Sequence, residues 1–451
     1  MAAMRAFVAA ALASLTIVVA GCGGSSPAGS ASGADLGSNA AQLVPPDALA
    51  FVAVDTDQSS QQWRQLDALT NGLAVRAQVL QKVNQALARH GLSYEQDVKP
   101  ALGKEVDLAV LKVEAGKPEV VAFAQPADQA KLRSLASNFD QENEHYTVQE
   151  IGGWSVVADS AEAFDAVRSA STGRSLGDTS AFTAAQAQVA GSAIVRAYVA
   201  AGAFKSLAQN LTILGAAAAA PAWAAAKVDV ASDTVRASAT VAGDVVPAPY
   251  AANLLRDVPS GAALAVSFKG SAQLARALAR VQTKMLPLPQ LGPLLTGEGV
   301  LYLRANGVVP ELALELAPAN PQVALARARA LLATAAGRLG PLRLTARLSA
   351  GKLVIADSPA AVSALRGGAK LVDDAAFKDA LNAAGAPQRR TALVYADVAQ
   401  LAPFLQLAAQ AAGGKPVDPT LADTLGHIGP LVAWATRSGG NSHFELWAKR
   451  R

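Results

Sequence analysis

The chain has 451 residues, of which 51% are hydrophobic and 16% are charged, and its formal net charge is +4. This length and composition predict two or three folded domains with proper cores. The charge is too small for the basic surface of a nucleic-acid-binding protein, so nucleic acid is not expected as a partner. A single cysteine excludes an intramolecular disulfide, and packing must hold the fold together.

The beginning of the chain has the pattern of an export signal. Arg5 precedes an apolar run over residues 6–20, which is short for a membrane span. Residues 19–22 read Val-Ala-Gly-Cys and end on the chain's single cysteine. This spacing resembles the lipobox of bacterial lipoproteins, and the resemblance implies removal of residues 1–21 and attachment of lipid to Cys22. The alternative is an ordinary cleaved signal with an unrelated cysteine.

The lipobox predicts the location of the protein. We expect an extracytoplasmic protein held on the cell membrane by the lipid at Cys22. Residues 22–42 are rich in Gly, Ser and Ala and cannot bury much apolar surface, so they are predicted to form a flexible tether.

Three segments recur in the same order along the chain, which predicts an internal duplication. The recurring pairs are residues 44–54 and 258–268, residues 153–160 and 351–358, and residues 176–182 and 371–377. We therefore expect two tandem units, unit 1 at residues 43–247 and unit 2 at residues 254–451. The proline-containing stretch 245–252 is the expected linker. Chance matching in an alanine-rich sequence is the alternative.

Each predicted unit alternates short apolar strands with helices. Unit 1 has expected strands at 49–54, 106–112, 119–124, 145–150, 154–158 and 193–199, and expected helices over 63–87 and 128–137 and from residues 161 and 182. Unit 2 has expected strands at 263–268, 299–305, 311–316, 342–348 and 353–356, and an expected helix from residue 321. Short glycine turns between strands favour hairpins, so each unit should be a largely antiparallel sheet with helices packed on it, an α+β fold.

These features together resemble a known family. The Val-Pro openings at residues 44–48 and 258–262, the Ala-Asp-Ser steps ending at Ser160 and Ser358, and the lipoprotein start are similar to an uncharacterised bacterial envelope family. It is the domain-of-unknown-function family number three thousand three hundred and fifty-two. The resemblance covers nearly all of the chain after the tether. It implies an envelope protein and lends no catalytic residues.

Two serines could be considered as nucleophiles. Ser160 and Ser358 each follow an aspartate at the end of a buried strand. Neither lies in a Gly-x-Ser-x-Gly elbow, and each precedes an expected helix. We therefore interpret both as helix N-caps.

Two further motifs point to chemistry only weakly. Residues 55–59 begin like a calcium loop but lack its central glycine and its bidentate glutamate, so capping of the helix before Trp63 is the favoured interpretation. Residues 349–352 match the Ser-x-x-Lys of penicillin-recognising enzymes but fall in an expected hairpin turn. The four histidines do not have metal-ligand spacing. We expect no catalytic residue, no metal and no cofactor.

One apolar stretch has no counterpart across the duplication. Residues 211–226 are rich in alanine and contain Ile213, Leu214 and Trp223, whereas the matching part of unit 2 is polar. The favoured interpretation is a buried helix. The alternative is an apolar lid or membrane contact bordered by those three residues.

The sequence therefore predicts a membrane-anchored lipoprotein that is not an enzyme and that binds or scaffolds other molecules. Its expected partners are the membrane, through Cys22, and an envelope protein or a lipid ligand. The alternative is a carrier of lipids or other hydrophobic ligands in the envelope, and a hydrolase is a more distant alternative.

Overall fold

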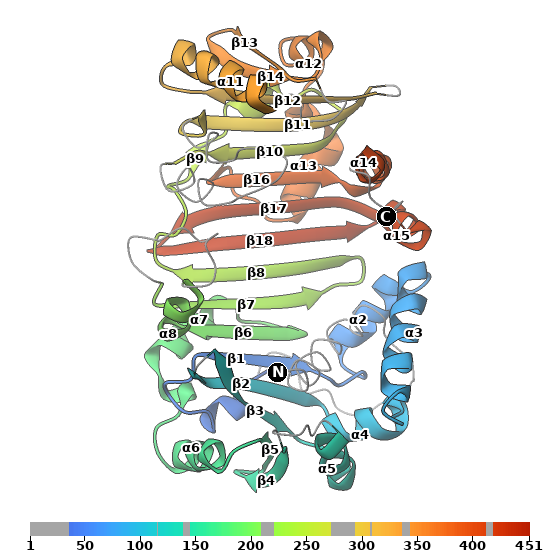
Figure 1. Cartoon of the computed structure of the whole chain (residues 1–451), viewed down its shortest axis with the longest axis vertical. Helices are drawn as coiled ribbons and strands as arrows, with labels where there is room; N and C mark the ends of the chain where they lie inside the picture. The colour runs from blue at the N-terminus through green and yellow to red at the C-terminus, as the bar shows by residue number, and fades with distance from the viewer. Residues whose placement is uncertain are drawn as a thin grey trace. The chain divides into compact units, whose positions relative to one another are not determined.

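The computed structural model describes residues 36–114, 116–138, 145–208, 221–271, 294–306, 309–335, 343–411 and 418–451. These residues divide into two compact units. Unit 1 contains the described residues up to Ser206 together with Pro221–Val241, and unit 2 contains Ala242–Arg451. Each unit is an antiparallel sheet with helices packed on it (Figure 1), which confirms the predicted α+β class.

The sheet of unit 1 has the strand order β8-β7-β6-β1-β2-β3-β5-β4. Its strands are β1 (Ala50–Asp55), β2 (Glu105–Glu114), β3 (Lys117–Ala124), β4 (Thr147–Ile151), β5 (Trp154–Ala158), β6 (Val195–Ala200), β7 (Trp223–Val230) and β8 (Thr234–Ala242). Its helices are η1 (Ala40–Gln42), α2 (Gln61–Thr70), α3 (Ala74–Ala88), η2 (Tyr94–Val98), α4 (Lys99–Leu102), α5 (Gln129–Asn138), α6 (Ala161–Thr172), η3 (Leu176–Asp178), α7 (Ser180–Gln188) and α8 (Ala201–Ala208).

The sheet of unit 2 has the strand order β18-β17-β16-β10-β11-β12-β14-β13. Its strands are β10 (Ala262–Lys269), β11 (Glu298–Asn306), β12 (Val309–Ala317), β13 (Thr345–Ser349), β14 (Lys352–Ala356), β16 (Ala392–Asp397), β17 (Ile428–Ser438) and β18 (Asn441–Arg450). A separate short ladder joins β9 (Tyr250–Ala251) to β15 (Arg389–Arg390). The helices are η4 (Leu254–Asp257), α11 (Pro321–Ala335), α12 (Pro359–Ala364), η6 (Leu371–Asp373), α13 (Ala375–Ala383), α14 (Val398–Ala411) and α15 (Pro419–Gly426).

The two strand orders are the same, with β10 of unit 2 in the place of β1 of unit 1. Phe51 on β1 lies opposite Tyr198 on β6, and Ala265 on β10 lies opposite Tyr395 on β16. This correspondence is what an internal duplication requires. An edge-to-face aromatic pair occurs at the same place in both units, with ring centroids 5.2 Å apart for Phe182–Tyr198 and 4.9 Å apart for Phe377–Tyr395.

Helices cover both faces of each sheet. Neighbouring residues of a strand point to opposite faces, and the apolar residues on each face pack against helices. In unit 1, α2 packs on Val54, while Phe182 of α7 packs on Phe51 of the opposite face. In unit 2, α11 packs on Leu353, while α12 and α13 pack in the cluster that contains Val354.

The helix-capping interpretations are confirmed. Ser160 Oγ accepts the backbone N–H of Ala163 at the start of α6, and Ser358 Oγ accepts that of Ala361 at the start of α12, each at 3.1 Å. Ser60 caps α2 in the same way, through the backbone N–H of Trp63 at 3.3 Å.

Three expectations about local structure are wrong. The single helix over 63–87 is interrupted by Gly72, whose φ of 81° is a left-handed conformation that ends α2 before α3 begins. The tether does not reach residue 42, because Leu36 and Ala40 are buried and Gly37 donates its backbone N–H to Glu105 at 2.6 Å. The last residues of the unmatched stretch, from Trp223 on, form β7 instead of a helix.

Over the described part of the chain, every helix is too short or too polar to cross a bilayer.

Candidate functional site

Of the predicted contact residues, the structure describes only Trp223. Trp223 is the first residue of β7, pairs with Ala200 of β6 and is 7% exposed. Ile213, Leu214 and Cys22 lie outside the described residues.

Unit 1 contains a pocket that the sequence did not reveal. Its volume is about 330 Å³, which is at the lower end of the range for small-molecule sites. The pocket lies between α3, the loop after β1 and the η2 turn, and it is lined by Gln58, Leu80, Val83, Asn84, Leu92, Ser93, Tyr94 and Glu95. We call it the α3 pocket.

The pocket exists because α3 is not close-packed. Apolar residues follow one side of α3 at helical spacing, at Val75, Val79, Leu80, Val83 and Leu87. All five are partly exposed, and no residue of α3 is buried. By contrast, α2 buries Trp63, Leu66 and Leu69. Among the described residues, the apolar side of α3 is therefore packed less completely than that of α2, although Leu87 at its end packs against the core cluster around Leu132.

Polar contacts hold the other wall of the pocket in place. Gln58 Nε2 donates to the Tyr94 hydroxyl at 2.9 Å. Asp97 accepts the backbone N–H of Ser93 at 2.8 Å and the Lys131 ammonium at 2.7 Å. The hydrogen bond from Lys131 holds the pKa of Asp97 below its ordinary value. These contacts hold the π-helical η2 turn, whose Tyr94 and Glu95 line the pocket, and π-helical turns often occur at functional sites.

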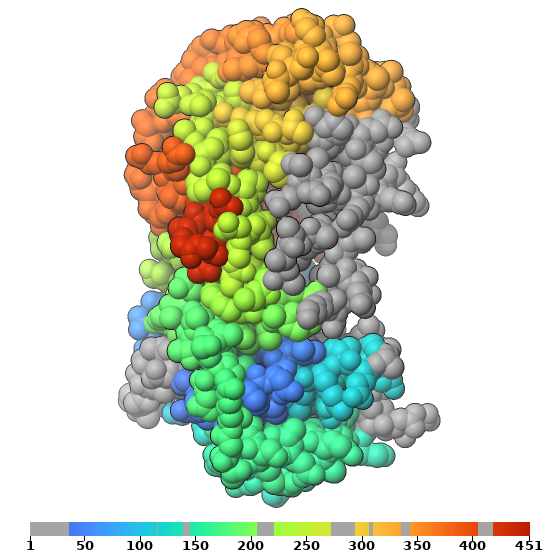
Figure 2. Space-filling model, turned by 90° about the vertical axis from the view of Figure 1, so that its left-hand side faces the viewer, coloured from blue at the N-terminus to red at the C-terminus, as the bar shows by residue number. Residues whose placement is uncertain are grey.

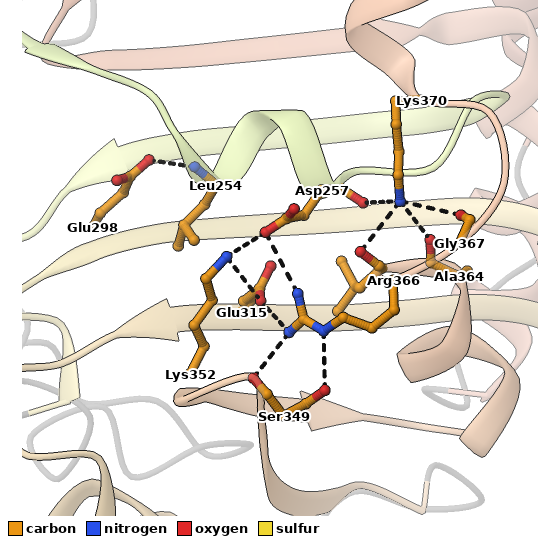
Figure 3. Close-up of polar contacts among 11 residues, drawn as sticks. Leu254, Asp257, Glu298, Glu315, Ser349, Lys352, Ala364, Arg366, Gly367 and Lys370 are labelled. Carbon is orange, nitrogen blue, oxygen red and sulfur yellow. Dashed lines mark hydrogen bonds and ion pairs between the residues drawn. The ribbon is translucent and has the colours of Figure 1, made fainter.

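Unit 2 contains a cluster of four charged side chains, Asp257, Glu315, Lys352 and Arg366 (Figure 3), which we call the ion cluster. The Lys352 ammonium lies 2.5 Å from Asp257 Oδ2 and 3.7 Å from Glu315 Oε1. Arg366 lies 3.5 Å from Asp257 Oδ2 and also donates to Glu315 Oε1. Two cations therefore bridge two carboxylates that come from η4 and β12.

Glu315 is the buried centre of the ion cluster. Its side chain is 0% exposed, whereas those of Asp257, Lys352 and Arg366 are 25–28% exposed. Burial raises the pKa of Glu315, and the hydrogen bond and charge of Arg366 oppose this shift. Glu315 Oε2 has no hydrogen-bond partner among the described residues.

Lys370, next to the ion cluster, has a different role (Figure 3). Its ammonium lies 3.1–3.2 Å from the backbone carbonyls of Asp257, Ala364, Leu365 and Gly367. It thereby satisfies carbonyls at the C-terminal end of α12, where a positive charge is favourable. Burial lowers the pKa of Lys370.

The Ser-x-x-Lys match lies in the β13–β14 turn, as expected. Ala350 and Gly351 have positive φ values of 49° and 75°. Ser349 Oγ accepts a hydrogen bond from Arg366 Nε at 2.9 Å, and Lys352 is held by the carboxylates of the ion cluster. Serine and lysine therefore act as structural members of the cluster.

Unit 1 has apolar residues in place of three of the four members of the ion cluster, and the fourth, Arg366, corresponds to Arg168, each eight residues after the capping serine of its unit. Phe123 lies opposite Val156 in β5, as Glu315 lies opposite Val354 in β14. Trp154 begins β5 as Lys352 begins β14, and Leu43 precedes Val44 as Asp257 precedes Val258. The three apolar residues, Leu43, Phe123 and Trp154, are 6%, 0% and 4% exposed. The fold therefore does not need charges at these positions.

Asp55 and Asp57, the carboxylates of the weak calcium-loop match, are tied into local structure. Asp55 Oδ1 accepts the backbone N–H of Asp57 at 2.9 Å, and burial raises the pKa of Asp55 to about 7. Within the ranges that the structure describes, no three His, Cys, Asp or Glu side chains lie close enough together to hold a metal ion.

The fold and these sites define an α+β protein of two similar units, with a small apolar pocket in unit 1 and an ion cluster in unit 2. Residues 6–163 match the model of the family described as Protein of unknown function (DUF3352). This match confirms the resemblance over the start of the chain and over unit 1 as far as α6. Comparisons with curated proteins and with solved structures found no match.

Proposed function

We propose that the protein is a non-catalytic lipoprotein of the cell envelope, anchored through Cys22, that binds a small apolar ligand in the α3 pocket. The observation that carries this proposal is the half-buried apolar side of α3, which faces a pocket of about 330 Å³.

The lining of the α3 pocket supports an apolar ligand with a polar end. Leu80, Val83 and Leu92 provide apolar walls, and a ligand that removes them from water gains roughly 25 cal/mol for each Å² of apolar surface buried. Gln58 and Asn84 provide neutral hydrogen-bonding groups that orient a ligand. This combination fits the hydrophobic-ligand carrier better than the hydrolase.

Binding of the fluorescent probe N-phenyl-1-naphthylamine tests the pocket. The double variant Leu80→Gln/Val83→Gln makes two walls polar and should weaken probe binding at least about tenfold, since each buried apolar side chain contributes more than 1 kcal/mol. The matched control is Val323→Gln/Leu421→Gln, because these side chains of unit 2 are 46% and 45% exposed and lie outside the pocket.

The control should bind the probe as the unaltered protein does. Equal probe binding by both double variants would exclude the α3 pocket as the site. Thermal melts of all proteins show whether lost binding comes from lost folding.

Labelling with radioactive fatty acid tests the anchor separately. The unaltered protein should be labelled and found in the membrane fraction, and Cys22→Ser should remove the label. A labelled Cys22→Ser variant would refute lipid attachment at Cys22, whatever the probe shows.

A further inference from the structure

The two units carry opposite charge in the part of each sheet that ends at an edge strand. In unit 2, residues 318–371 form α11, β13, β14 and α12, and they contain eight Lys and Arg residues and one Asp. In unit 1, residues 125–176 contain the equivalent α5, β4, β5 and α6, with four Lys and Arg residues and eight Asp and Glu residues. We call the described residues of this range in unit 2, 318–335 and 343–371, the basic edge module (Figure 1).

Six of the seven described Lys and Arg residues of the basic edge module fall into two groups, and the seventh, Arg347, is half-buried. Lys352 and Arg366 are neutralised within the ion cluster, and Lys370 binds backbone carbonyls. Arg327, Arg329 and Arg343 are exposed and pair with no acidic side chain among the described residues. This second group is available to a partner.

The available arginines lie on elements that pack together. Arg327 and Arg329 are on α11, and Arg343 directly precedes β13. α11 contacts β13, and Arg329 Nε donates to the carbonyl of Ala346 at 3.4 Å. Figure 2 shows the residues of this range, in yellow-orange and orange, side by side at the surface.

We propose that the basic edge module binds the surface of an anionic lipid bilayer. Charges that are spread over a helix and the start of a strand suit an extended anionic surface better than a single anion. The inference also uses the proposed anchor at Cys22. Cys22 lies 14 residues before Leu36, and a chain of 14 residues spans at most about 50 Å, so the anchor keeps the folded body close to the membrane.

The size of the effect follows from membrane electrostatics. A Lys or Arg residue near an anionic bilayer contributes about 1 kcal/mol, which is roughly a fivefold change in binding. Removal of three such charges should therefore weaken binding roughly 100-fold at low salt, and the effect should shrink as salt screens the charges.

Co-sedimentation with vesicles tests the proposal. The protein is the mature chain from residue 22 with Cys22→Ser, so that no acyl chain contributes. The vesicles contain phosphatidylcholine alone or with phosphatidylglycerol. The test variant is Arg327→Gln/Arg329→Gln/Arg343→Gln. The matched control is Lys117→Gln/Arg133→Gln/Arg174→Gln, which removes the same charge from exposed positions of unit 1.

The unaltered chain and the control should bind the anionic vesicles and not the neutral ones, and the test variant should lose this binding. The variant Arg327→Lys/Arg329→Lys/Arg343→Lys keeps the charge and should bind. It preserves the test if the glutamine variant does not fold.

Three results would overturn the proposal. They are equal binding to neutral and anionic vesicles, equal loss in the test and control variants, and tighter binding to a polyglutamate peptide than to the vesicles, which would indicate an acidic protein partner. None of them affects the proposed α3 pocket, whose probe binds in unit 1.

Discussion

Arg366 compensates a carboxylate that has no contact with water. Glu315 is 0% exposed, and Arg366 and Lys352 are the cations that the structure places against it. Removing one partner of a buried pair leaves an uncompensated charge, which costs far more than loss of a surface pair.

Arg366→Met should therefore lower the free energy of unfolding by about 3 kcal/mol, measured by urea denaturation. The equivalent residue of unit 1 is Arg168, whose ion pair with Asp165 is 51% and 72% exposed. Arg168→Met is the matched control and should cost at most about 1 kcal/mol. Similar losses in the two variants would mean that Glu315 is not held by Arg366.

The same reasoning gives an opposite expectation when both carboxylates and Lys352 are replaced together and Arg366 is kept. Asp257→Leu/Glu315→Phe/Lys352→Trp installs the residues of unit 1, and a well-packed apolar set often equals or exceeds a buried ion network in stability. The triple variant should therefore be at least as stable as the single variant Arg366→Met.

Asp55 makes the stability of unit 1 depend on pH. Burial raises the pKa of this carboxyl to about 7 in the folded protein, against about 4 in an unfolded chain. Between these values the folded state binds more protons than the unfolded state, so the contribution of Asp55 to stability falls as pH rises from about 4 to 7.

Asp55→Asn removes this dependence and keeps an acceptor for the Asp57 backbone N–H. The melting temperature of the variant relative to the unaltered protein should rise between pH 4 and pH 8. Asp165→Asn, at an exposed position, is the control and should show a flat difference. A flat difference for Asp55→Asn as well would contradict the assignment.

At the scale of elements, the position of Trp223 in β7 bears on whether this residue belongs to the core or contacts a ligand. The residue begins an interior strand of the unit 1 sheet and is 7% exposed. Its indole is therefore packed inside the unit, which favours a structural role over a ligand contact.

Trp223→Ala should lower the free energy of unfolding by roughly 3–5 kcal/mol, the cost of emptying a buried tryptophan site. Thermal melts check this, and Leu421→Ala, at a side chain that is 45% exposed, should change the melting temperature little. Nearly intact stability with weakened flotation on liposomes would restore the contact role.

At the scale of the whole molecule, the two units share a framework and differ in what it carries. Phe51 lies opposite Ala109 in unit 1, whereas Ala265 lies opposite Tyr302 in unit 2. The large ring is on β1 in unit 1 and on β11, the neighbour of β10, in unit 2. The two residue pairs therefore have similar total volumes, and cores tolerate exchanges that conserve volume. The α3 pocket is described in unit 1 and the basic edge module in unit 2, so the units also differ in these two features.

Local patterns in the sequence were enough to predict most strands and several of the helix starts. Glycine turns between apolar runs predicted the hairpin of β4 and β5, and Ser160 and Ser358 were identified as caps. The hairpin and the caps depend on residues within a few positions of one another, so the local sequence is enough to predict them.

Burial, the ion cluster and the α3 pocket depend on residues that are far apart in the sequence, so only the tertiary structure decided them. Leu36 and Ala40 are buried because a sheet lies beneath them, although their own segment is poor in apolar residues. The ion cluster needed the register that places Glu315 near Lys352, and the α3 pocket needed the packing that leaves Leu80 half-exposed. The sequence alone determined most of the strands, the caps and the repeated order, because these follow from local periodicity and backbone preference. The sites were decided only by folding, because burial and charge pairing depend on which strands and helices meet.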